Sequence, residues 1–419
     1  MVAPKLRVSA ATVTATTKTL RMADELAAAR RADAPAAAQG TSDAQMRRLV
    51  GRPTPLQTKF QGADCGGGVV GSAYEANLGQ ALKMGTISSQ STIWSQESLV
   101  SVPEGCKPFG CRLELDDLDV WDTHRYELRQ TTRHGDGAHA QLELHTDRTT
   151  GAMVCVKRFS RGRLCENAMA FHQKHPRDLE NPWQELRFAH ELGPQGDSGN
   201  LGICPYRGIF RDASGDALIA TDWMAQGDLF SFVSSLGVPG PAREAKFLPV
   251  LRAILTRVSA LHSIGLAHCD LSVENVLLHP PAPDGTIFDV VLIDFAMAVS
   301  GEDARAAVGI RGKPIYRPPE VYEGRPYDAH AADLFACGVM AYTLAIGRYP
   351  WISTAPGECV AYNYCMAHGF PAFIQKRRVP EKAGARVVSC MSKNLAAVIG
   401  TLISPDPRVR YTALQAFGL

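Results

Sequence analysis

Two short stretches of the chain contain side chains that together suit the chemistry of phosphoryl transfer. The first stretch, His268–Leu278, reads HCDLSVENVLL and places Asp270 five residues before Asn275 on a loop with apolar flanks. The second, Val290–Ala296, reads VVLIDFA and places Asp294 at the end of an apolar strand. Phosphoryl transfer needs one carboxylate to orient the attacking hydroxyl, and a second carboxylate and an amide oxygen to hold Mg²⁺. These three side chains supply that set.

Each of the three residues also has a purely structural interpretation, because Asp and Asn often cap loops and turns. The two stretches in this order nevertheless resemble the catalytic loop and the metal-binding loop of eukaryotic protein kinases. On that resemblance Asp270 is the catalytic base, and Asn275 and Asp294 bind Mg²⁺. The resemblance extends from about residue 124 to the end of the chain.

A glycine-containing turn lies between two strand-like segments. Gly135 and Gly137 match the first two glycines of the glycine-rich turn of kinases, whereas the third position is Ala140. Glycines allow backbone amides to approach a phosphate closely. A lone Gly-Asp-Gly is also typical of an ordinary hairpin turn. The resemblance implies that Gly135, Gly137 and Leu142 contact ATP.

Lys157, in VCVKRF, lies among apolar neighbours on a predicted strand. One interpretation is a solvated lysine at a strand end, and the other is an inward ammonium over the α- and β-phosphates. An inward lysine needs an acidic partner. Glu185, in the amphipathic run PWQELRFAHEL, resembles the partner glutamate of kinases, and Glu191 is the alternative. The segment before this run, Ser160–Asn181, is longer than usual.

The segment Leu218–Phe230, LIATDWMAQGDLF, resembles the fifth strand, the hinge and the following helix of a kinase. On that match Thr221 is the gatekeeper, and its small side chain leaves the pocket behind the adenine open to bulky inhibitors. The backbone carbonyl of Asp222 and the backbone of Met224 are expected to bind the adenine edge.

Three residues of the C-terminal half separate protein kinases from small-molecule kinases of related fold. Glu320, in RPPE, resembles the glutamate that ends the activation loop. Asp333 matches the buried aspartate that braces the catalytic loop, and Arg410 matches the arginine that pairs with the glutamate. Alone, each has an ordinary alternative as a helix-terminal or surface charge.

Five further positions, besides Ala140, depart from the usual kinase pattern. Cys269 replaces the arginine before the catalytic aspartate, and Gly309 stands where the activation-loop phosphothreonine is usual. Because the phosphate and its receptor are both missing, we expect activity without phosphorylation of this loop. Ser272 replaces a lysine, which predicts lower turnover or a substituted cation, and Lys313 replaces a threonine. Ala296 replaces the glycine of Asp-Phe-Gly.

The resemblance favours serine and threonine over tyrosine as acceptors, because the catalytic-loop pattern of tyrosine kinases is absent. Asp228 and Glu274 lie where basophilic kinases place acids. We therefore expect protein substrates with a modest preference for one basic residue before the phosphorylated one.

The order of predicted elements, strands first and helices later, indicates an α+β fold. The resemblance implies two lobes with an ATP cleft between them: a small β-rich N-lobe with one main helix, and a larger α-helical C-lobe. We predict a low-complexity, mostly disordered extension over residues 1–120, with one short helix at Met22–Arg31, and a kinase domain over residues 121–419. The lobes are expected over about 124–223 and 224–419. The expected strands are Tyr126–Thr131, Ala140–Leu144, Met153–Phe159, Tyr206–Phe210 and Leu218–Met224, and Pro249–His262 is expected to be helical.

Composition excludes several classes of protein. The 44 basic and 42 acidic side chains nearly balance, so no basic field suggests nucleic-acid binding. No apolar run approaches the about 18 residues that a membrane span needs. The 11 cysteines are scattered without a C-x-x-C pair, which indicates core residues in a reducing compartment, and we expect a cytoplasmic protein. A transit peptide is the less favoured interpretation of the N-terminus. Nothing in the sequence indicates an oligomeric state.

The favoured hypothesis is therefore a serine/threonine protein kinase that uses ATP and Mg²⁺. The alternative is a pseudokinase, a kinase-shaped nucleotide-binding scaffold or allosteric partner. Four departures favour it: Ala140, Cys269, Ser272 and Lys313. Phosphorylation of a small metabolite is the third hypothesis.

Overall fold

The structure is a computed structural model in which all described residues belong to one compact unit of the chain. It describes residues 113–131, 140–176, 178–193, 201–280, 289–382 and 384–418. The helix expected at Met22–Arg31, the extension up to residue 112, and the turn with Gly135 and Gly137 lie outside these residues.

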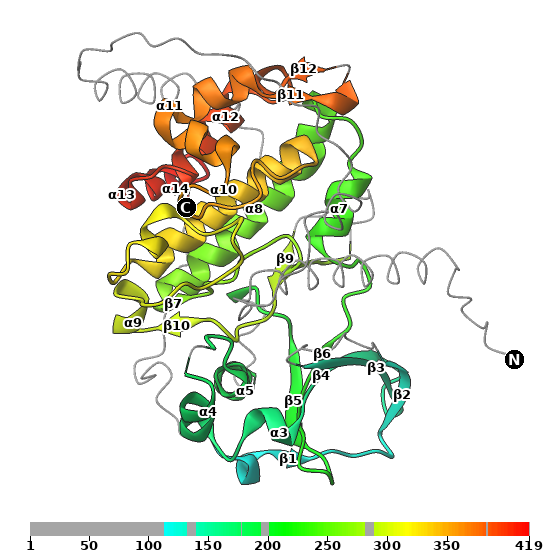
Figure 1. The fold of residues 1–419 in the computed structure, drawn as a ribbon. Coiled ribbons are helices and arrows are strands. Elements are labelled where there is room, and N and C mark those ends of the chain that lie inside the picture. The colour runs from blue at the N-terminus through cyan, green and yellow to red at the C-terminus, as the bar shows by residue number, and fades with distance from the viewer. Residues whose placement is uncertain are drawn as a thin grey trace, which may run out of the picture. The chain divides into compact units, whose positions relative to one another are not determined.

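The N-terminal lobe is built on a six-stranded sheet with the order β1-β5-β6-β4-β3-β2 (Figure 1). β1 runs parallel to β5, and every other neighbouring pair is antiparallel. The strands are β1 (Asp119–Val120), β2 (Tyr126–Thr131), β3 (Gln141–Asp147), β4 (Met153–Phe159), β5 (Tyr206–Arg211) and β6 (Ala217–Asp222). All five strands expected from the sequence are present. β3 ends three residues later than expected, and β6 ends at Asp222, two residues before the expected Met224.

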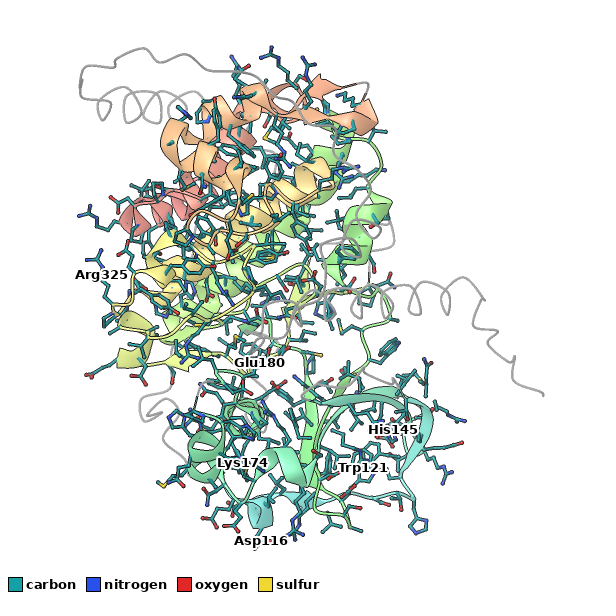
Figure 2. All side chains as sticks on the ribbon, viewed as in Figure 1. Asp116, Trp121, His145, Lys174, Glu180 and Arg325 are labelled. Carbon is teal, nitrogen blue, oxygen red and sulfur yellow. The ribbon has the colours of Figure 1, made fainter. Side chains whose placement is uncertain are left out.

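Residues 113–121 also belong to this lobe. Leu113 and Leu118 are buried in its core, and the intervening turn is a 3-10 helix, η2 (Leu115–Asp117). Trp121 stacks on Tyr126 with ring centroids 4.4 Å apart, and it meets His145 edge-on at 5.3 Å (Figure 2). The boundary predicted at residue 120 is therefore too late, because a two-residue strand has no alternation that a sequence can display.

Three helices pack against the face of the sheet that carries Phe159, Ile209 and Ile219. They are α3 (Arg161–Leu164), α4 (Ala168–Lys174) and α5 (Pro182–Leu192). The first two come from the long segment before α5, and they place Leu164 and Phe171 against the side chain of Trp183. The indole Nε1 of Trp183 donates a hydrogen bond to the carbonyl of Leu164 at 2.7 Å. α5 begins where Asn181 caps the backbone N–H of Trp183, with proline at the first helical position.

The C-terminal lobe is mainly helical. Its helices are α7 (Leu229–Ser235), α8 (Pro241–Ser263), α9 (Glu302–Arg305), α10 (Ala329–Ile346), α11 (Val360–Lys376), α12 (Lys393–Leu402), α13 (Pro407–Arg410) and α14 (Thr412–Gln415), with 3-10 turns η3 (Pro319–Tyr322), η4 (Pro380–Lys382) and η5 (Val387–Ser389). Three short strand pairs join β7 (Leu266–Ala267) to β10 (Val299–Ser300), β8 (Val276–Leu278) to β9 (Val290–Leu292), and β11 (Arg378–Val379) to β12 (Ala385–Arg386). The helix expected at Pro249–His262 is the later part of α8.

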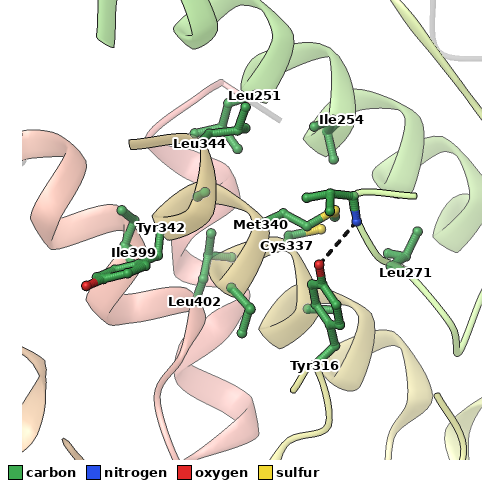
Figure 3. Close-up of a cluster of buried hydrophobic side chains, with 14 of the residues drawn as sticks. Leu251, Ile254, Leu271, Tyr316, Cys337, Met340, Tyr342, Leu344, Ile399 and Leu402 are labelled. Atoms are coloured by element: carbon green, nitrogen blue, oxygen red, sulfur yellow. Dashed lines mark hydrogen bonds between the residues drawn. The ribbon is translucent and has the colours of Figure 1, made fainter. Parts of the chain in front are cut away.

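The core of this lobe lies between α8, α10 and α12, with α8 and α10 side by side (Figures 1 and 3). Leu251 and Ile254 of α8 are fully buried and recur at helical spacing. Gly338 of α10 is required by the close approach of α12, because a Cβ there would lie 2.6 Å from Cγ2 of Ile403. The segment between Asp294 and Glu320 is called the activation segment below. Its Tyr316 enters this core and accepts a hydrogen bond from the backbone N–H of Val273 at 3.2 Å (Figure 3).

α10 is the one described helix that is long and apolar enough to cross a membrane, with a mean hydropathy of 1.4 over 18 residues. It is 94 % buried inside the protein, and its N-terminus is capped by Asp328. Burial by the surrounding helices makes it the core helix of the C-terminal lobe. The cysteines that it and its neighbours carry, Cys337, Cys365 and Cys390, are unpaired and buried, as expected for small core residues.

Candidate active site

The loop that carries Asp270 is braced by the buried side chain of Asp333 from α10. The carboxylate of Asp333 accepts hydrogen bonds from the backbone N–H groups of His268, at 2.7 Å, and Cys269, at 2.9 Å. Burial alone would raise the pKa of Asp333, but the hydrogen bond with His262 and the surrounding donors lower it. The two bonds hold Cys269 at a φ of +62°, a conformation that non-glycine residues rarely adopt.

Asn275 is packed directly against Asp270. Its Nδ2 donates to the backbone carbonyl of Asp270 at 2.8 Å and to Oδ2 at 3.1 Å. The amide nitrogen therefore fixes the carboxylate, and the amide oxygen points away from it. The β8–β9 pair then brings in Asp294, because the backbone N–H of Ile293 donates to the carbonyl of Asn275 at 3.1 Å.

Asp294 adopts a φ of +70°, which also lies in the left-handed region. In that conformation its Oδ1 lies 3.0 Å from Nζ of Lys157. Burial alone would raise the pKa of Asp294, but the charge and the hydrogen bond of Lys157 lower it to about 2. Asp294 is therefore an anion over the whole physiological pH range.

Lys157 faces inward and binds Glu185 as well, with 2.7 Å between Nζ and Oε2. The structure thus gives Glu185, rather than Glu191, as the partner that an inward lysine needs. Burial raises the pKa of the Glu185 carboxyl to about 7. The helix that carries Glu185 is connected to the loop that carries Asp294, since the backbone N–H of Asn181 donates to the carbonyl of Ala296 at 3.0 Å.

The same face of the sheet carries two of the expected nucleotide contacts. Leu142 lies opposite Lys157 in the β3–β4 register, and Thr221 lies opposite Cys155 in the β4–β6 register. Asp222 ends β6, and the following chain turns at Met224, whose carbonyl accepts from the N–H of Gly227 at 3.1 Å. The adenine contacts of Thr221, Asp222 and Met224, and the phosphate contacts of Gly135 and Gly137, stay predictions.

Lys313 lies next to Asp270, and its contacts are ones that the sequence alone did not predict. Its Nζ donates to Oγ of Ser272, lies 3.3 Å from Oε2 of Glu274, and lies 3.9 Å from Oδ2 of Asp270. The signals in the sequence are that positions 272 and 313 both depart from the family pattern and that Ser272 predicts a substituted cation. Their contact needs the fold, because 41 residues separate them.

The activation segment is held by protein contacts at the position of the missing phosphothreonine. Ala307 and Tyr327 form a backbone bridge, and the hydroxyl of Tyr327 donates to the carbonyl of Gly309 at 3.2 Å. A guanidinium nitrogen of Arg311 donates to the carbonyl of Met297 at 3.0 Å. These bonds lie where the resemblance predicts an arginine–phosphate contact that Cys269 cannot make.

Glu320 and Arg410 form the expected pair at the end of this segment. The guanidinium is fully buried and binds both carboxylate oxygens, at 2.5 and 2.9 Å. It also donates to the carbonyls of Ala331 at 3.0 Å and Ser404 at 2.8 Å. The contact therefore fixes the end of the activation segment to α10 and α13.

The donors at the site suit Mg²⁺, which prefers oxygen ligands. Asp294 supplies an ionised carboxylate, and its side chain is 40 % exposed. Asn275 supplies an amide oxygen, because its nitrogen is engaged by Asp270. These two residues would hold the ion.

The sequence pattern of the family described as "Protein kinase domain" matches residues 128–418. The human protein NUAK family SNF1-like kinase 1 is 25 % identical over 228 residues, which are 54 % of this chain and 30 % of that protein. Serine/threonine-protein kinase SRK2A of Physcomitrium patens is 27 % identical over 238 residues, which are 57 % of this chain and 60 % of that protein. Calcium-dependent protein kinase 12 of Oryza sativa subsp. japonica is 29 % identical over 283 residues, which are 67 % of this chain and 46 % of that protein. The match covers less than two thirds of the length of each relative.

Proposed function

Because this chain belongs to the protein kinase family, we propose that it transfers the γ-phosphate of ATP, with Mg²⁺, to serine and threonine hydroxyls of proteins. The observation that carries the proposal is the connected set of Glu185, Lys157 and Asp294, linked at 2.7 and 3.0 Å beside the Asp270–Asn275 pair. The serine/threonine-protein kinases among its relatives support the choice of acceptor.

Each residue of the set has a distinct part in the proposed reaction. Asp270 orients the acceptor hydroxyl and takes its proton, while the amide of Asn275 keeps the carboxylate in position. Lys157, held by Glu185, binds the α- and β-phosphates. Mg²⁺, when bound by Asn275 and Asp294, neutralises phosphate charge.

The direct test is transfer of the γ-phosphate from ATP to a mixed peptide library, with Mg²⁺ and with an excess of EDTA. We expect transfer that EDTA abolishes, and the phosphorylated residues identify the acceptor class. A rise in melting temperature with Mg·ATP but no transfer would instead support the pseudokinase.

Phosphatase treatment is expected to leave the transfer rate unchanged within about twofold. The reason is that Gly309 is held by the Tyr327 hydroxyl and carries no phosphorylated side chain itself. The measurement is the initial rate before and after treatment, with intact mass confirming that phosphate has been removed. A loss of activity that tracks the loss of phosphate would contradict this prediction.

The preference for an upstream basic residue is expected to be modest. Asp228 is mostly buried and caps α7 through the N–H of Ser231 at 2.8 Å, and Glu274 already faces Lys313. Both acids are thus partly engaged within the protein. A positional-scanning peptide library measures the preference, and no enrichment of Arg or Lys before the acceptor would rule it out.

A further inference from the structure

The catalytic loop lacks a cation of its own beside Asp270. Ser272 occupies the position of the lysine that other kinases direct at the γ-phosphate. Charge develops on the transferring phosphoryl group, and a positive group beside it is among the largest contributions to catalysis. The protein therefore needs that charge from another element.

The activation segment brings an ammonium to this place. Lys313 is only 12 % exposed, and its Nζ lies 3.9 Å from Oδ2 of Asp270. The contact is close because Gly312 precedes it: a Cβ at Gly312 would lie 2.8 Å from the backbone carbonyl of Cys269. On the other side, the carbonyl of Pro314 accepts from the hydroxyl of Thr354 at 2.9 Å and from its N–H.

The surroundings direct the ammonium of Lys313 toward Asp270. An ammonium has three donors, and two of them are directed at Oγ of Ser272 and at the carboxylate of Glu274. These two contacts hold Nζ beside the Asp270 carboxylate, at the proposed transfer site.

We propose that Lys313 is a catalytic residue that supplies the γ-phosphate with the positive charge missing at Ser272. In this protein the cation is carried by the activation segment instead of the catalytic loop, and Oγ of Ser272 accepts a hydrogen bond from it. This inference rests on the proposed function. It also makes the two departures interdependent, because lysines at both positions would place two ammonium groups side by side.

The first test exchanges the two residues. Lys313→Thr is expected to lower kcat by about 10²-fold with little change in the KM for peptide, as for loss of one group that stabilises the transition state. Ser272→Lys alone is expected to lower activity as well. The double variant Ser272→Lys/Lys313→Thr restores the usual family arrangement and is expected to exceed Lys313→Thr by at least about tenfold.

Lys393→Thr is the matched control, because Lys393 is exposed at the start of α12. Its kcat is expected to equal that of the unmodified protein. Wild-type kcat in Lys313→Thr, or a double variant no better than Lys313→Thr, would overturn the proposal.

The second test does not depend on transfer and therefore separates this inference from the proposed function. In an Asp270→Asn background, the affinities for ADP and for the β,γ-imido analogue of ATP are measured with Mg²⁺ by calorimetry. Lys313→Gln keeps a hydrogen-bond donor but removes the charge. It is therefore expected to lower the affinity for the analogue by about tenfold and the affinity for ADP by less than about twofold. Equal changes for the two nucleotides, or no change, would refute the role of Lys313 even if the protein transferred no phosphate.

Discussion

Replacing Asp270 with asparagine is expected to lower kcat for phosphate transfer by about 10²–10⁴-fold, the usual contribution of a positioned acid–base group. Asparagine matches the shape of the side chain but cannot accept the proton of the acceptor hydroxyl. The Asn275 amide, which now donates to Oδ2 at 3.1 Å, can still donate to an amide oxygen at that position. The fold and nucleotide affinity should therefore persist while transfer is lost.

The measurement is single-turnover transfer at saturating ATP and peptide, with nucleotide affinity determined on the same sample. Asp119→Asn makes the same chemical change at an exposed position of β1 and is expected to transfer at the wild-type rate. Transfer by Asp270→Asn within about tenfold of wild type would show that another group handles the proton.

Replacing Arg410 with alanine is expected to destabilise the protein by about 3–5 kcal/mol, because it leaves the Glu320 carboxylate without its buried partner. The guanidinium is fully buried, lies over the ring of Phe335 with 5.2 Å to the centroid, and donates to two backbone carbonyls. All of these contacts are lost together. Chemical denaturation followed by near-UV circular dichroism measures the change in the free energy of unfolding.

Arg408→Ala provides the control two residues away. That arginine is exposed and pairs only locally with Asp406, so its removal should leave the unfolding curve close to wild type. The double variant Glu320→Gln/Arg410→Ala should be more stable than the sum of its single changes predicts, because neither charge is left alone. Additive effects would mean that the two side chains stabilise the protein independently.

The residues that the sequence could place are those that local structure brings together. Asn275 and Asp294 flank the same end of one strand pair, β8–β9, and Asp270 lies on the loop just before it, where the Asn275 amide binds it. Lys157 and Glu185 needed one further inference, that a lysine inside a sheet requires a buried acid. The resemblance to a known family supplied the two-lobed arrangement, which the strands and helices of the structure confirm.

The residues that it could not place depend on contacts between distant segments. In the sequence, Lys313 is a departure that argues against an active kinase. Only the structure shows that its ammonium contacts Ser272. Residues 113–120 are predicted as part of the low-complexity extension, since Leu113 and Leu118 show no periodicity along the chain and are recognisable as core residues only once they pack in the N-terminal lobe. In both cases the contacts join segments that are distant in the sequence and form only when the chain folds.

The hydrogen bond between Asn181 and Ala296 connects α5 directly to the loop that carries Asp294. The side chain of Gln184, which donates to the carbonyl of Ala298, reinforces this connection. α5 cannot swing outward without breaking bonds to this loop. On the proposed function, the position of α5 and the binding of Mg·ATP are therefore thermodynamically linked. A ligand that shifts α5 is then expected to change the affinity for Mg·ATP, and Mg·ATP to change the affinity for that ligand by the same factor.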